Sequence, residues 1–163
     1  MAPRRPKQNA KSTVHDIVKK LKKYSVPKTK EGMARYGIET RHALGVSIPN
    51  ISKIAKKIGT NHNLALQLWR TKMHEARILA AIIDDPCCVT EKQIESWVKD
   101  FHSWDLCDQC CGRLFDKTNF AYQKAFEWSE RDEEFVKRAG FVLMAALAVH
   151  DKQAPDKNFR QFF

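Results

Sequence analysis

The feature that most constrains this chain is the spacing of its apolar residues, which follows the period of an α-helix along most of the length. The first clear example runs from Val14 to Leu21, where apolar side chains recur at i, i+3, i+4 and i+7 and lysines occupy positions between them. A second example follows Ser47 and stops at Gly59, a residue type that commonly ends helices. No segment alternates apolar and polar residues long enough to predict a strand, so the sequence indicates an all-α fold.

Capping residues and prolines mark the boundaries of the other helices. Thr90, with Gln93 three residues later, predicts a capping box, and Asp84-Asp85-Pro86 predicts the end of the preceding helix because proline disfavours helix before it. Prolines and glycines interrupt residues 25–46, so we expect a long connection there with a single helical turn near residues 30–36. Further helices are expected at 63–69, 74–83, 90–101, 103–115, 119–128 and 133–150.

Two of these helices share a sequence pattern. The segments from Arg77 to Asp84 and from Arg138 to Asp151 each begin with arginine, continue with small and apolar residues, and end with aspartate. Helical hairpins that repeat along one apolar seam predict an α-α superhelix of HEAT-like hairpins, because stacking buries what a single hairpin cannot. We expect a disordered basic arm at 1–11, the repeat domain at 12–152, and the start of a truncated helix or a tail at 153–163.

The positive charge is concentrated at the beginning of the chain. The formal net charge is +10, and residues 1–30 account for +9 of it, because their lysines and arginines are opposed by Asp16 alone. A basic protein favours polyanionic partners such as nucleic acids. Since the remaining residues are nearly neutral, we expect any affinity for nucleic acid to depend strongly on this segment.

Cysteine usage and hydropathy bear on the cellular setting. The five cysteines are odd in number and no secretory leader precedes them, so we expect no disulfide framework and an intracellular location, cytoplasmic in a bacterium or nuclear in a eukaryote. Cys107 and Cys110 form a CxxC pair without a matching second pair, which favours buried thiols over zinc ligands. No apolar run approaches the roughly 20 residues of a membrane span, so no membrane partner is expected.

Residues 102–115 place two carboxylates and a tryptophan at the start of an apolar helix. With Ser103 as the N-cap, Asp105 falls in the first turn, where the helix dipole stabilises negative charge. Asp108 follows Trp104 by four residues and so shares its face of the helix. A carboxylate beside an indole either stabilises a passing positive charge or serves the helix itself, and the residues alone leave both interpretations open. A second polar group opens the helix at 74–83, where solvation or support of the hairpin is the simpler interpretation: His74, Glu75 and Arg77.

Six short motifs carry a resemblance to one protein family. They are Met33-Ala-Arg-Tyr-Gly37, Gly45-Val-Ser-Ile-Pro49, Ile54-Ala-Lys-Lys-Ile-Gly59, His74-Glu-Ala-Arg-Ile-Leu-Ala80, Ser103-Trp-Asp-Leu-Cys-Asp108 and Phe135-Val-Lys-Arg-Ala-Gly140. Together they are similar to the AlkD-like DNA alkylation repair proteins, over about residues 12–152. The resemblance implies HEAT-like repeats and, as in some members of that family, release of N3- and N7-alkylated purines from double-stranded DNA.

The resemblance also implies roles for individual residues. Trp104 and Asp108 correspond to the active-site tryptophan and aspartate of the family, and Arg138 corresponds to its cleft arginine. The resemblance implies no metal and no cofactor. Around these residues we expect contacts to DNA from Asp105, Arg77, Lys53, Lys56, Lys57 and Lys137.

The chemistry suits these residue types. Alkylation at N3 or N7 makes the purine cationic and a good leaving group, so a strong general acid is unnecessary. Asp108 can stabilise the oxocarbenium-like sugar and orient the attacking water. The indole of Trp104 can pack on the cationic nucleotide, a contact worth about 0.5–2 kcal/mol. Arg138 can hold a nearby phosphate in a charge-assisted contact.

The C-terminal end leaves other functions open. Members of the family usually continue into further repeats that add another aromatic wall to the cleft, whereas this sequence stops at Phe163. An incomplete superhelix leaves an apolar face uncovered. The alternatives are therefore a catalytically inactive DNA-binding HEAT module or a protein-binding helical scaffold, with self-association through the C-terminal end.

Overall fold

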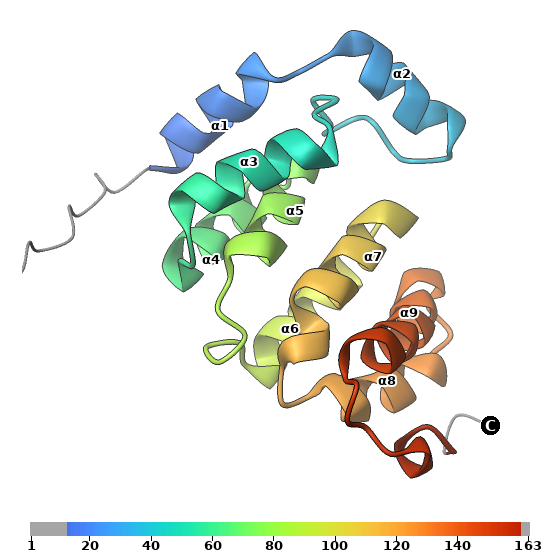
Figure 1. Ribbon diagram of the computed structural model, residues 1–163. Helices are drawn as coiled ribbons and strands as arrows, with labels where there is room; N and C mark the ends of the chain where they lie inside the picture. The colour runs from blue at the N-terminus through green and yellow to red at the C-terminus, as the bar shows by residue number, and fades with distance from the viewer. Residues whose placement is uncertain (1–12, 161–163) are drawn as a thin grey trace, which may run out of the picture.

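The computed structural model describes residues 13–160, and every regular element within them is helical (Figure 1). This confirms the predicted all-α class, while the expected disordered arm at 1–11 lies outside the described residues. The α-helices are α1 (Val14–Lys23), α2 (Pro27–Arg35), α3 (Ile48–Ile58), α4 (His62–Arg70), α5 (His74–Ile83), α6 (Glu91–Lys99), α7 (Trp104–Arg113), α8 (Ala121–Ser129) and α9 (Glu134–His150). Two short 3-10 turns, η1 (Phe115–Lys117) and η2 (Asp156–Asn158), follow α7 and α9.

Helix α2 corrects the expectation of a long connection with a single helical turn. It has nine residues, and Pro27 occupies its first turn. Proline is favourable at that position because its fixed φ suits the helix and its missing N–H would have no partner there. Gly32 lies within α2 with no neighbouring atom close to it, so it weakens the helix without interrupting it. The true connection therefore covers residues 36–47, and Gly37 near its start has a φ of 73°, in the left-handed region.

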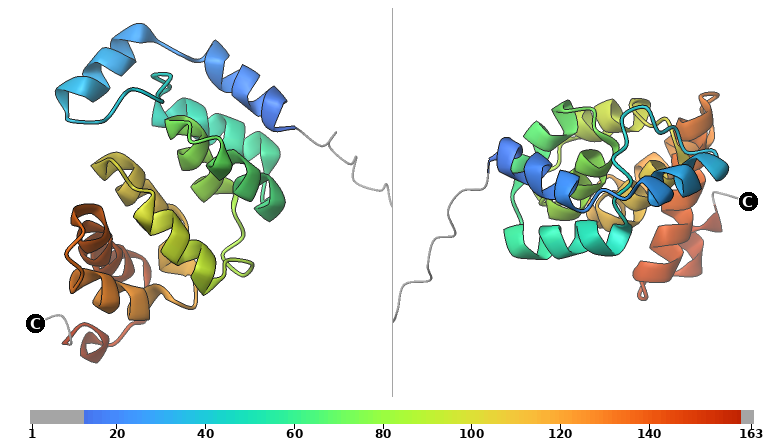
Figure 2. Two further views of the ribbon diagram at one scale, coloured as in Figure 1. Left: turned by 180° about the vertical axis from the view of Figure 1, so that it is seen from behind. Right: turned by 90° about the horizontal axis from the view of Figure 1, so that it is seen from above.

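The helices stack in a row from α1 to α9, as the predicted superhelix requires (Figure 1). Helix α3 contacts α5, α5 contacts α7, and α7 contacts α9, while α4 packs on α5 and α8 packs on α9. Figure 2 shows the same progression from behind and from above. Each inner helix therefore buries one face against the preceding helix and one against the next.

The core that joins the hairpins is apolar and aromatic. Trp69 and Trp97 stack in parallel with their ring centroids 3.9 Å apart, and Trp128 is fully buried, as expected for core tryptophans. Cys107, Cys110 and Cys111 are likewise buried. Burial raises the pKa of the Cys110 and Cys111 thiols well above the ordinary value, so both remain protonated packing groups.

A glycine allows α9 to approach the end of α8 closely. A Cβ atom at Gly140 of α9 would lie 2.4 Å from the backbone nitrogen of Ser129 and 2.8 Å from the carbonyl carbon of Trp128. Any side chain at this position would push α9 away from the end of α8. The position of Arg138, two residues earlier on α9, therefore depends on this contact.

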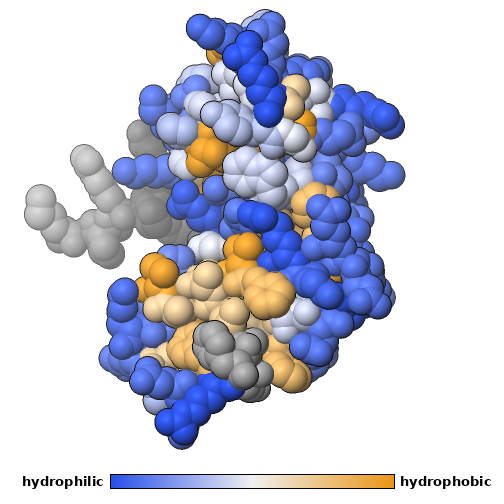
Figure 3. All heavy atoms as spheres, turned by 90° about the vertical axis from the view of Figure 1, so that its right-hand side faces the viewer, coloured by the Kyte–Doolittle hydropathy of each residue, from blue (hydrophilic) through white to orange (hydrophobic). Residues whose placement is uncertain are grey.

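The last hairpin leaves apolar side chains exposed. Phe141 and Val149 of α9 are 50% and 58% exposed. Apolar residues gather on the lower part of the face shown in Figure 3, below a mainly hydrophilic upper part. In the expected truncated helix or tail at 153–163, the described part contains only the turn η2, and Phe159 packs edge-to-face on Tyr122. No helix among the described residues is long and apolar enough to cross a membrane.

Candidate functional site

Helix α7 presents Trp104 at its first position with the indole partly in solvent. The side chain is 39% exposed, and its Nε1–H donates a hydrogen bond of 2.9 Å to the carbonyl oxygen of Tyr36, just after α2. This bond fixes the edge of the indole and leaves a ring face accessible. Trp104 differs in this respect from Trp69, Trp97 and Trp128, which are all buried.

Asp108 lies one turn further along α7 and is paired with Arg138 of α9. The guanidinium donates from Nε to Oδ1 at 3.0 Å and from Nη2 to Oδ2 at 2.9 Å, which is a bidentate arrangement. Hydrogen bonding to Asp108 raises the pKa of Arg138. Because a carboxylate offers about four lone-pair sites, the pair orients Asp108 without using all of its acceptors.

Asp105 turns toward α5 and pairs with His74. Nε2 of the buried His74 lies 2.7 Å from Oδ2 of Asp105. Burial alone would raise the pKa of Asp105, but the hydrogen bond and charge of His74 hold it below the ordinary value. Asp105 is therefore an ionised carboxylate bound to a neighbouring helix, in addition to being the first-turn acid that the sequence predicted.

Four of these side chains, Trp104, Asp105, Asp108 and His74, line one cavity of about 330 Å³, whereas Arg138 is bound to Asp108 but is not a lining residue. Its polar wall comes from the side chains just described, and its apolar wall comes from Met33 of α2, Ile38, Ile48 of α3 and Ile78 of α5. An apolar pocket of this size with a few convergent polar groups is typical of small-ligand and nucleotide-base sites. We call this cavity, lined by Trp104, Asp105 and Asp108, the α7 cleft.

The wall of the α7 cleft that precedes α3 is anchored by Glu75. This side chain is completely buried, and its carboxylate accepts hydrogen bonds from the backbone N–H groups of Leu44, Gly45 and Val46 at 2.7–3.2 Å. Successive N–H groups that converge in this way form an anion-binding nest. Glu75 is thus neither solvated nor part of the cleft: it holds the connection between α2 and α3 in place.

Arg77, for which the sequence predicts a DNA contact, lies mostly buried in the structure. Arg77 is 7% exposed, its Nη2 donates to Asp100 at 3.0 Å, and its guanidinium lies 5.0 Å from the Trp69 ring centroid. Burial lowers its pKa. Its hydrogen-bond donors are engaged inside the protein: Nε donates to the Trp69 carbonyl, Nη1 to the Asp100 carbonyl and Nη2 to the Asp100 carboxylate. The Trp69 indole N–H donates to the same Asp100 oxygen as Nη2.

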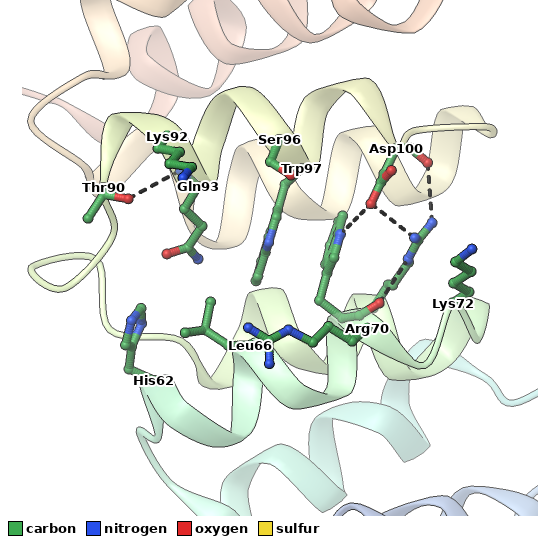
Figure 4. Close-up of a pocket in the computed structure, with 12 residues that line it drawn as sticks. His62, Leu66, Arg70, Lys72, Thr90, Lys92, Gln93, Ser96, Trp97 and Asp100 are labelled. Atoms are coloured by element: carbon green, nitrogen blue, oxygen red, sulfur yellow. Dashed lines mark hydrogen bonds and ion pairs between the residues drawn. The ribbon is translucent and has the colours of Figure 1, made fainter.

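Arg77 also borders a different cavity, of about 530 Å³, between α4 and α6 (Figure 4). Asp100 closes one end of this cavity, and Arg70, Lys72 and Lys92 lie around it. None of the residues that line the α7 cleft lies here. The two cavities are therefore separate.

The predicted lysines also divide between locations. Lys137 is exposed on α9 beside Arg138. Lys53, Lys56 and Lys57 are exposed on α3 and line a third cavity, against α1, that shares no residue with the α7 cleft. The structure thus brings together Trp104, Asp105, Asp108 and Arg138, with Lys137 next to them, and places the α3 lysines elsewhere.

Sequence reasoning missed two partners of the α7 cleft. One is the carbonyl of Tyr36, a backbone atom that side-chain patterns cannot show. The other is His74, which binds Asp105 across 31 positions of sequence. The signal for His74 was its place at the first position of α5, but pairing it with Asp105 requires knowing that α5 and α7 are neighbours.

Comparisons with known proteins identify the family and the fold. The family described as "DNA alkylation repair enzyme" matches residues 17–162. A solved structure described as "a new family of proteins related to the HEAT-like repeat DNA glycosylases with affinity for branched DNA structures" is similar with a TM-score of 0.80 and 24% identity, which confirms the HEAT-like superhelical fold. The similarity covers 93% of this chain and 63% of that one, so this chain spans less than two thirds of its length. No curated protein matches the sequence. Because the family match extends over most of the residues, the chain belongs to the DNA alkylation repair enzyme family.

Proposed function

We propose that this protein binds double-stranded DNA and hydrolyses the N-glycosidic bond of N3- and N7-alkylated purines in the α7 cleft. The observation that carries the proposal is the pairing, on one face of α7, of an exposed, oriented indole with a carboxylate held by arginine. Family membership supports DNA repair as the setting.

Trp104 supplies the contact to the damaged nucleotide. Its N–H is occupied by the Tyr36 carbonyl, so it presents a ring face rather than a hydrogen-bond donor. The negative face of an indole attracts a cation, and the alkylated purine carries a positive charge that an unmodified purine lacks. The indole thereby favours the damaged base over its neighbours.

Asp108 supplies negative charge where positive charge develops on the sugar. The alkylated base leaves as a neutral purine, so no strong acid is required, and the electron-poor sugar carbon needs an anion and a water nearby. The bidentate contact to Arg138 orients Asp108 in advance, which is the condition for electrostatic stabilisation without reorganisation. The Arg138 donors not used by Asp108 can bind an adjacent phosphate.

Release of alkylated base from DNA tests the proposal. We expect release by the unaltered protein and a loss of at least about 100-fold with Asp108→Asn, the scale on which removing one electrostatic group slows other active sites. Asp132→Asn, which removes an exposed carboxylate outside the α7 cleft, is the matched control and should retain full activity. Melting curves check folding, because the Asp108–Arg138 pair is partly exposed and contributes at most about 1 kcal/mol. Release no greater than that of Asp108→Asn would refute catalysis.

A second candidate function is DNA binding without base release. It is favoured by the similar structure, whose own description includes affinity for branched DNA. This candidate predicts salt-sensitive DNA binding that survives Asp108→Asn and is reduced by Trp104→Ala. The same base-release assay, run beside a binding assay, separates the two functions.

A further inference from the structure

A groove lined by lysines lies between α1 and α3, away from the α7 cleft. It has a volume of about 490 Å³. Lys20 and Lys23 line it from α1, Lys53, Lys56 and Lys57 line it from α3, and Tyr24 lies at the end of the α1 wall. All five lysines are exposed. We call this site the lysine groove.

The lysines of the groove have no paired carboxylate among the described residues. Among the described residues, none of its five lysines takes part in an ion pair, in contrast to Lys124, which contacts three glutamates. Asp16 lies on α1 one turn before Lys20, but its carboxylate is engaged by Thr13 in the capping box. Ammonium groups facing one another across a groove repel, and a linear polyanion relieves several such repulsions at once.

The lysine groove and the α7 cleft share no lining residue and contact α3 at different positions. Ile48, the first residue of α3, lines the cleft, whereas Lys53 and Lys57 line the groove. At about 1.5 Å and 100° per residue, Lys57 lies about 13 Å along the axis from Ile48 and about 180° around it. Lys53 lies about 140° around the helix from Ile48. Lys56, the remaining α3 lysine of the groove, lies about 80° around the helix from Ile48. Two of the three α3 lysines of the groove therefore face away from the side of α3 that lines the α7 cleft.

We propose that the lysine groove is a second DNA site, which binds the phosphate backbone of a duplex segment other than the one in the α7 cleft. The protein then contacts two duplex segments at once, either two arms of a branched molecule or two separate duplexes. The contacts are to phosphate, since lysine ammonium groups act as point charges without base specificity. The proposal rests on DNA binding in the α7 cleft for the first segment, but it does not require base release.

Counting short duplexes per protein tests this proposal. We expect two duplexes to bind the unaltered full-length chain in calorimetric titration, and one to bind Lys20→Gln/Lys23→Gln. The matched control is Lys19→Gln/Lys22→Gln, which removes the same charge from exposed positions of the same helix outside the groove and should retain two. For the second binding event of the unaltered protein, log K should fall with log salt by about 0.9 for each phosphate neutralised, so by at least about 1.8 when Lys20 and Lys23 each neutralise one phosphate.

A variant of the opposite wall and a change in the cleft complete the experiment. Lys53→Gln/Lys57→Gln, on the α3 wall, should also reduce the number of bound duplexes from two to one. The same result from both walls would show that the groove is responsible, and not a loss of α1 stability. Trp104→Ala should remove the duplex bound in the α7 cleft and leave the duplex in the lysine groove. If the protein releases no base, the numbers of bound duplexes expected here stay the same. A single duplex on the unaltered protein, or equal behaviour of the groove and control variants, would overturn the proposal. Groove-dependent binding to anionic lipid vesicles with no change in duplex count would also overturn it, in favour of a membrane partner.

Discussion

Replacing Glu75 with glutamine should loosen the connection that carries one wall of the α7 cleft. The substitution keeps the size of the side chain and removes its charge. In the structure, the buried carboxylate accepts from three successive backbone N–H groups, and Oε1 alone receives a hydrogen bond from each of them. A glutamine amide keeps one acceptor oxygen and turns an NH₂ group toward a site built from donors.

The magnitude follows from these contacts. A hydrogen bond to a charged group contributes about 1.5–3 kcal/mol and one to a neutral group about 0.5–1.5 kcal/mol, so each of the three N–H groups loses about 1 kcal/mol. We therefore expect Glu75→Gln to lower the free energy of unfolding by about 3 kcal/mol, which for a chain of this length corresponds to roughly 6–12 °C in Tm.

Urea unfolding measures the loss in free energy, and tryptophan quenching locates it. Trp104 is exposed while the other three tryptophans are buried, so acrylamide quenching in the folded state reports mainly on Trp104. Because the Tyr36 carbonyl belongs to the segment that Glu75 anchors, quenching should increase in Glu75→Gln. Glu130→Gln, at the exposed end of α8, is the control and should change neither quantity. A loss in Glu75→Gln below about 1 kcal/mol would show that the nest does not hold this connection.

Three further substitutions test packing and charge. Gly140→Ala should lower the free energy of unfolding by more than about 2 kcal/mol, because the added Cβ would meet the Ser129 backbone. Gly112→Ala, where no atom lies close, should be neutral or stabilising by up to about 1 kcal/mol. Chemical denaturation compares the two variants, and equal effects would contradict the close contact at Gly140. The pKa of Asp105 is lowered in the folded protein, so the contribution of this carboxylate to stability is present above the ordinary pKa of 3.8 and is lost as the pH falls through the folded pKa. The difference in unfolding free energy between the unaltered protein and Asp105→Asn should therefore shrink below pH 3.8. A difference that stays constant with pH would argue against the His74 contact. Lys124→Met should lower the free energy of unfolding by about 1–2 kcal/mol, because the three glutamates around Lys124 are partly exposed. Breaking a fully buried ion pair would cost about 3–5 kcal/mol. A Tm that is unchanged or raised would show that the cluster does not stabilise the fold.

The repeating part of the fold could be predicted because local sequence determines it. The amphipathic spacing of α1 and α3 arises from a buried stripe on each helix, and the structure buries Ile17, Leu21, Ile51 and Ile54 accordingly. Thr90 caps α6 as expected by accepting from the Gln93 N–H, but the Gln93 side chain donates to Asp84 instead of completing the capping box. Whether a capping box is completed depends on which other acceptors the glutamine side chain can reach. The four residues of the capping pattern do not show that Asp84 lies within reach of Gln93.

Helix α2 was predicted only as a single turn for a related reason. It has no buried residue, so its sequence carries no apolar stripe of the kind that reveals α1 and α3. Its position is maintained from outside, by the N–H of Val26 donating to the Gly45 carbonyl at 3.0 Å and by the close approach of Gly45 to Val26 and Lys30. Such a helix is visible in sequence only through Pro27 at its start, and proline also occurs in loops.

The α7 cleft combines both kinds of information. Trp104 and Asp108 could be selected from sequence because they share a helix face, but the orientation of the indole depends on Tyr36, which follows the poorly encoded α2. Tyr36 in turn leads into the connection that the buried Glu75 holds by its backbone. The aromatic wall is thus fixed by a segment with little buried surface of its own and by one carboxylate of α5. It follows that substitutions in α2 and at Glu75, which touch neither Asp108 nor Arg138, should alter recognition of the base while leaving the carboxylate pair intact.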